Sequence, residues 1–188
     1  MVKGINRRKF LGAVAKTSCG CAVAAGFTGC AGLSGNSSSQ KESKLGAFCG
    51  LYCGACPLYL TSIKAKDSSK VVCLGCKSDK LAEHCLKCAI KDCAAAKNLN
   101  SCGECDQFPC EKTKPFHNSD KDMAKVAEKS CYRIRQTSYF AWTKEQVGRW
   151  TCKNCGSAFS FSDETCPSCK TDVYSCKEEA TDYLEKQT

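Results

Sequence analysis

Cysteines dominate the chemistry that this chain can perform. The sequence has 20 of them in 188 residues, far more than an ordinary globular composition. Two cysteines separated by two residues can turn both thiols toward one ion, which is the usual spacing of zinc knuckles and iron–sulfur loops. This spacing occurs twice near the C-terminus, in the set Cys152, Cys155, Cys166 and Cys169. We predict a four-thiolate metal site there, with zinc as the expected ion and a rubredoxin-like iron centre as the alternative.

Eleven further cysteines fall between residues 49 and 110, mostly in the same short spacing. They are Cys49, Cys53, Cys56, Cys73, Cys76, Cys85, Cys88, Cys93, Cys102, Cys105 and Cys110. The last six form two C-x2-C-x4-C groups offset by 17 residues, which indicates a local duplication. So short a repeated spacing favours metal ligation over disulfides or inert buried thiols. We expect zinc or a [4Fe–4S] cluster in this region.

Three other residues leave alternatives open. His84 lies beside a cysteine group and is either a ligand or a solvated surface residue. Cys131 falls on the apolar face of a predicted helix, so it is either a twelfth ligand or a small buried residue. Cys176 lies outside every pattern and is not assigned.

The cysteine-rich stretch resembles a known family. The motifs FCGLYCGACPLYL, VVCLGCKSDKL, HCLKCAIKDCAAAKN and SCGECDQFPCEK occur in order within roughly residues 45–117, and together they are similar to the family called domain of unknown function 3795. The resemblance implies a small prokaryotic domain that binds metal or a cluster and has no established activity. It also implies that a trailing zinc ribbon is common.

The N-terminus resembles an export signal. Arg7 and Arg8, followed by Lys9, Phe10 and Leu11, resemble the twin-arginine motif, and residues 1–29 form the predicted signal peptide. Residues 27–30 resemble a lipoprotein cleavage site that would leave lipid on Cys30, with simple cleavage near residues 24–25 as the alternative. We expect a lipid-anchored protein at the periplasmic or outer face of the cell membrane.

The net charge does not indicate nucleic-acid binding. The formal charge is +9, but five of the 28 basic residues lie in the signal, which leaves 23 basic against 19 acidic residues. No aromatic–basic stripe accompanies them, so we expect no nucleic-acid partner. The sequence also shows no Ser/His/Asp set, P-loop or dinucleotide fingerprint, which disfavours an enzyme.

We expect the cysteines to be positioned by a small α+β fold that metal binding organises. It has short helices, irregular cysteine loops and a β-hairpin zinc ribbon. The expected segments are a signal (1–29), a flexible Gly/Ser-rich tether (30–44), a cysteine-rich domain (45–118), a helical connector (119–149), a zinc-ribbon or rubredoxin-like module (150–175) and a tail (176–188).

Local patterns refine this expectation. Cys49, Cys53 and Cys56 have a spacing that would place them on one helix face. We predict helices after Pro57 and over residues 89–97, and two connector helices with N-caps at Ser119 and Thr143. Residues 71–72 and 157–162 have strand character. The connector is expected to pack through Phe140, Trp142 and Trp150.

Overall fold

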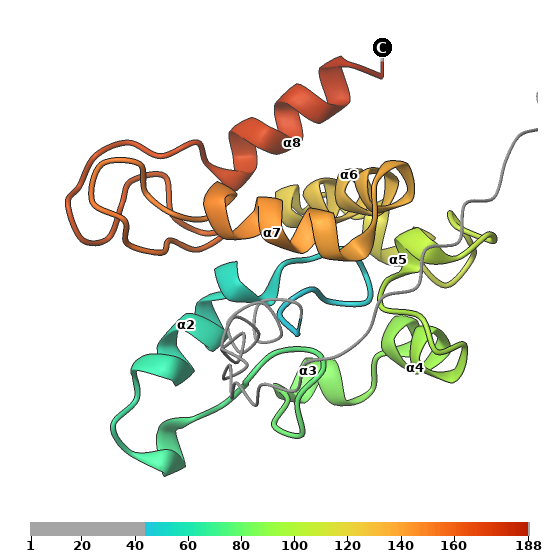
Figure 1. Cartoon of the computed structure of the whole chain (residues 1–188), viewed down its shortest axis with the longest axis horizontal. Helices are drawn as coiled ribbons and strands as arrows, with labels where there is room; N and C mark the ends of the chain where they lie inside the picture. The colour runs from blue at the N-terminus through green and yellow to red at the C-terminus, as the bar shows by residue number, and fades with distance from the viewer. Residues whose placement is uncertain (1–43, 188) are drawn as a thin grey trace, which may run out of the picture. The chain divides into compact units, whose positions relative to one another are not determined.

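The structure, a computed structural model, describes residues 44–187 and is helical (Figure 1). The α-helices are α2 (Pro57–Lys64), α3 (Glu83–Leu86), α4 (Ala89–Ala96), α5 (Lys114–His117), α6 (Asp122–Gln136), α7 (Tyr139–Arg149) and α8 (Cys176–Glu185), and three single 3-10 turns are η1 (Cys53–Ala55), η2 (Ser68–Lys70) and η3 (Cys102–Glu104). Arg7, Arg8, Cys30 and nearly all of the tether lie outside the described residues.

The expected α+β class with a β-hairpin zinc ribbon is wrong. Over residues 44–187 the chain forms no strand, only three isolated antiparallel bridges, which pair residues 46 and 52, 151 and 158, and 165 and 172. The alternating segment 157–162 does not build a ladder, because Phe159 N–H bonds back to Trp150 O whereas Phe161 N–H bonds to Ala55 O, outside the loop. The backbone pairing that a hairpin needs therefore ends after one bridge, because the next N–H group bonds to a residue outside the loop.

The helices after Pro57 and over residues 89–97 are confirmed as α2 and α4. The segment from Cys49 to Cys56 is not a helix, so its three cysteines do not share a helical face. Gly50 has φ +93°, and Ala47 N–H bonds to Leu51 O at 2.7 Å, which closes a turn before η1. The strand-like residues 71–72 also lack a partner strand; instead Ser62 Oγ accepts the N–H groups of Val72 and Cys73 at 2.9 and 3.0 Å.

The connector forms two helices, as predicted, but both begin elsewhere. The N-cap of α6 is Lys121 rather than Ser119, and α7 begins after Ser138, whose side chain accepts the N–H of Ala141. Thr143 lies inside α7 and donates to the carbonyl of Phe140. The longer α7 places Trp142 and Trp150 in the core, as expected, whereas Phe140 is 63% exposed and that part of the packing prediction is wrong.

The predicted tail folds as α8. Ser175 caps it, and Ser175 and Glu178 form a reciprocal capping box. The carboxylate of Glu179 is nearly buried and pairs with Lys129 of α6 and Arg149 of α7, each at 2.8 Å. These ion pairs attach α8 to both connector helices, and α8 also packs against α6.

In the part of the chain that the structure describes, the core has two clusters of buried side chains. The larger one joins Trp142, Tyr139 and Trp150 to the C-terminal cysteine loop and α8. The smaller one joins Ile90 and Phe108 to Cys102 and Cys131. Cysteines thus contribute to both clusters. Within residues 44–187 no helix is long and apolar enough to cross a membrane.

Candidate metal centre

Two similar turns build the C-terminal cysteine site. In the first, Cys152 O accepts the N–H of Gly156 at 2.9 Å, and Cys152 N–H bonds to Ser157 O at 2.9 Å. In the second, Cys166 O accepts the N–H of Lys170 at 2.9 Å, and Cys166 N–H bonds to Thr171 O at 2.8 Å. Each turn therefore presents its two thiols on the same side of a tight backbone loop.

The residue after the second cysteine of each turn has a left-handed backbone. Gly156 has φ +73°, which glycine adopts at little cost. Lys170 has φ +64° at the matching position of the second turn, a conformation that an L side chain rarely adopts. The same left-handed backbone conformation therefore occurs with glycine in one turn and with lysine in the other.

The four sulfur atoms lie at the spacing of ligands around one ion. Those of Cys152, Cys155, Cys166 and Cys169 are all within 4.8 Å of one another. Cys152 Sγ lies 3.7 Å from Cys169 Sγ, and Cys155 Sγ lies 3.5 Å from Cys166 Sγ. Tetrahedral zinc with Zn–S bonds of about 2.3 Å requires sulfurs about 3.8 Å apart. The site could hold a metal ion, as the C-x2-C spacing predicted.

Polar neighbours favour the thiolate form at the exposed side of the site. Hydrogen bonding with Thr171 and Asn154 lowers the pKa of Cys169 to about 5, and hydrogen bonds from Ser157 lower the pKa of Cys155. Metal ligation requires the thiolate rather than the thiol. Two ligands of the set are therefore predisposed to bind a cation.

Aromatic packing holds the site against α7. Trp150 is 2% exposed and its ring contacts those of Phe159 and Phe161, with centroids 5.4 and 5.1 Å away. Trp150 Nε1 donates to Gln146 Oε1 at 3.1 Å. Cys152 and Cys166 face this core and are buried, whereas Cys155 is exposed. One side of the site is thus anchored and the other is open to solvent.

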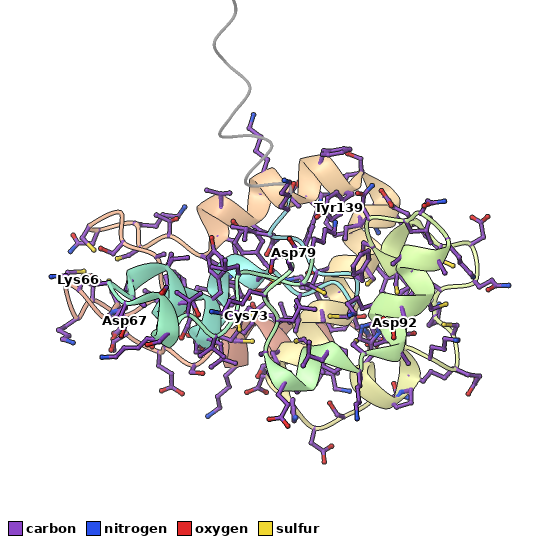
Figure 2. All side chains as sticks on the ribbon, turned by 90° about the horizontal axis from the view of Figure 1, so that it is seen from below. Lys66, Asp67, Cys73, Asp79, Asp92 and Tyr139 are labelled. Carbon is purple, nitrogen blue, oxygen red and sulfur yellow. The ribbon has the colours of Figure 1, made fainter. Side chains whose placement is uncertain are left out.

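The eleven cysteines of residues 49–110 gather in two neighbourhoods that share Cys88, and Cys49 belongs to the first one through Cys53 and Cys76. In the first, burial and the nearby thiols of Cys76, Cys73, Cys88 and Cys56 raise the pKa of Cys85 to about 11. Cys53 Sγ accepts the N–H of Cys76 at 3.2 Å, so this group also includes η1. Cys73 lies on the segment after η2. In the view of Figure 2 it lies between Lys66 and Asp67 on the left and Asp92 of α4 on the right.

The second neighbourhood joins α4 to η3 and the turn before α5. Burial and the nearby thiols of Cys110, Cys105, Cys93 and Cys88 raise the pKa of Cys102 to about 12. In neither neighbourhood do three sulfurs come within 4.8 Å of one another; among residues 44–187 only the C-terminal set does so. Metal ligation by the cysteines of residues 49–110 stays a prediction.

The three open residues have different surroundings. His84 is exposed on α3. Cys131 is fully buried on α6, where its thiol donates to Cys49 O at 3.4 Å. Cys176 is buried at the start of α8, and burial raises its pKa to about 12. None of the three joins a group of ligands close enough for one ion.

One buried residue was missed by sequence reasoning. His117, at the end of α5, is 1% exposed, and its Nε2 lies 3.0 Å from Cys49 O while Nδ1 has no partner. Burial lowers its pKa, although the contact with Cys49 acts in the opposite direction. No local motif marks this histidine, since its environment comes from Phe108 and Phe116, which contact its ring in the fold.

Comparisons with known proteins give one match. Neither the curated proteins nor the solved structures include a significant match to the chain. A family model matches the part that holds the eleven clustered cysteines and ends before α6. Residues 45–115 match the family described as "Protein of unknown function (DUF3795)".

Proposed function

We propose that this is an exported, lipid-anchored metal-binding protein whose C-terminal four-cysteine site holds zinc in a structural role. The observation that carries the proposal is the convergence of four thiols within 4.8 Å on two matched turns. Zinc fits because it prefers tetrahedral thiolate ligands, has no redox chemistry and stabilises small loops that lack a large core. The site has no ligand position left open, which is typical of structural rather than catalytic zinc.

The proposed export route agrees with the cysteine content. Arg7 and Arg8 with the following Phe10 and Leu11 resemble the twin-arginine signal, which directs folded proteins. An unfolded chain with this many thiols would form mixed disulfides in an oxidising compartment. Folding around metal in the cytoplasm avoids this outcome, because it ligates the thiolates before export.

Replacing both Arg7 and Arg8 by Lys is expected to leave the precursor in the cytoplasm, since the paired guanidinium groups rather than the charge are recognised. The Cys30→Ser variant is expected to be exported but released from the membrane, because it lacks the lipid-bearing thiol. The measurement is immunoblotting of cytoplasmic, membrane and soluble exported fractions. Export of the double-lysine variant would point to the general secretory route, and a membrane-bound Cys30→Ser protein would disprove the lipid anchor.

An electron carrier is the second candidate function. It would need a redox-active metal centre in addition to the zinc site, and the thiols of residues 49–110 are the available ligands. The observation that favours it is a cavity beside α4 whose wall includes four of these cysteines. An electron carrier requires a redox-active centre in that cavity, whereas a purely structural role does not.

A further inference from the structure

A cavity of about 460 Å³ lies beside α4, and four cysteines from separate segments line it. Cys93 belongs to α4, Cys102 to η3, Cys105 directly follows η3, and Cys110 begins the turn before α5. Apolar Ile90, Ala94, Leu99 and Phe108 form much of the remaining wall. These ligands come from the second C-x2-C-x4-C group and the last cysteine of the first.

The cavity differs from the C-terminal site in the spacing of its sulfur atoms. There the four sulfurs are already at single-ion spacing, whereas no three sulfurs among residues 49–110 approach within 4.8 Å of one another. Thiolates that each bind a different metal atom of one larger centre lie further apart than thiolates around a single ion.

We propose that this cavity binds a [4Fe–4S] cluster through Cys93, Cys102, Cys105 and Cys110. In such a cluster each cysteine ligates its own iron at one corner of a cube, so the four sulfurs lie further apart than around one ion. The proposal extends the proposed metal-binding function to a redox centre. It does not depend on the identity of the ion at the C-terminal site, because the two sites share no ligand.

Two lysines, Lys97 and Lys112, and one acid, Glu111, line the cavity, and this net positive charge suits a cluster with four thiolate ligands, which is an anion. Lys97 Nζ lies 3.6 Å from Cys105 Sγ and donates to Gln107 Oε1 at 2.7 Å, so the ammonium group is held beside that sulfur. Thr113 Oγ1 lies 3.9 Å from Cys110 Sγ. Hydrogen bonds and nearby charge at the ligating sulfurs are the means by which proteins tune cluster potential.

Apolar side chains on one wall of the cavity limit the access of solvent to a bound cluster. Ile90, Ala94 and Phe108 are each less than a tenth exposed and belong to one buried cluster with Cys102. Limited solvent access protects a cluster from loss of iron and helps to set its potential. The cavity therefore combines thiol ligands, a neighbouring ammonium group and a partly apolar wall.

The test uses the full chain, purified without oxygen and incubated with ferrous iron and sulfide. We expect broad visible absorbance that dithionite bleaches reversibly, together with a low-temperature paramagnetic signal of the reduced protein. The Cys105→Ser and Cys110→Ser variants should each bind about four fewer irons and four fewer sulfides per chain than the unchanged protein. Both positions are only partly buried, so the substitutions should leave the fold intact.

The matched control is Cys176→Ala, which removes a buried thiol outside the cavity and should retain all the iron. Retained zinc and unchanged protease resistance of residues 45–115 show that each variant is folded. Iron content that does not change in Cys105→Ser and Cys110→Ser would overturn the proposal. A colourless protein with zinc at these cysteines would also overturn it, while leaving the C-terminal zinc site unaffected.

Discussion

A Cys166→Ser variant is expected to lose about one zinc per chain and to unfold the C-terminal cysteine loop. Cys166 is fully buried, and its sulfur lies 3.5 Å from that of Cys155. Structural zinc contributes on the order of 10–16 kcal/mol of apparent binding free energy in small thiolate sites, and residues 150–175 contain no helix or strand that could persist alone. Metal analysis of the purified full chain and limited proteolysis within residues 150–175 measure the two effects.

The control for this experiment is the Cys176→Ala variant, which also loses one buried thiol. Cys176 is also buried and lies close to the loop in sequence, but it is not part of the four-sulfur group. The Cys176→Ala variant should keep its zinc and its protease resistance. Unchanged zinc content in the Cys166→Ser variant would show that the four thiols are not the metal ligands, whatever their spacing.

A Gly50→Ala substitution should lower the free energy of unfolding by about 3 kcal/mol, because two costs combine. Gly50 has φ +93°, which is unfavourable for alanine. Its added Cβ would also lie 2.2 Å from Ala127 O and 2.8 Å from Cys131 Sγ on α6. Neither obstacle can move easily, since both belong to the buried side of α6. Denaturant unfolding of the full chain, followed by circular dichroism, gives the change.

Gly156→Ala separates the two costs. Gly156 also has a positive φ, +73°, but a Cβ there would meet no atom within 4 Å. Only the backbone cost should remain, so this variant is expected to lose about 1 kcal/mol. Equal losses in the two variants would show that α6 does not pack closely on the turn at Gly50.

The sequence was informative where a residue's role depends on its immediate neighbours. The C-x2-C spacing correctly predicted that Cys152, Cys155, Cys166 and Cys169 come together, because each pair is positioned by its own turn. Pro57 correctly marked the start of α2, since proline suits the first helical position. The Ser175-x-x-Glu178 capping box was present but overlooked, and it would have predicted α8.

The features that the sequence did not predict depend on contacts between segments that are far apart in the chain. The alternation in residues 157–162 predicted a strand, but Phe161 N–H bonds to Ala55, more than a hundred residues earlier. The burial of His117 likewise comes from Cys49 and Phe108, which no local pattern connects to it. The motifs that resemble the family were found in roughly residues 45–117, and the family model matches residues 45–115, but the cavity beside α4 could only be found from the assembled fold.

The hydrogen bond from Phe161 N–H to Ala55 O, 3.0 Å long, has a thermodynamic consequence for loading the protein. Ala55 is fully buried between Cys53 and Cys56, so the C-terminal loop rests directly on the first cysteine turn. A metal that orders the loop would therefore also favour the ordered form of η1. Linkage makes this effect reciprocal: a metal bound at η1 would strengthen metal binding at the C-terminal site by the same factor. Molecules with a metal at only one of these two positions would then be rarer than independent sites would give.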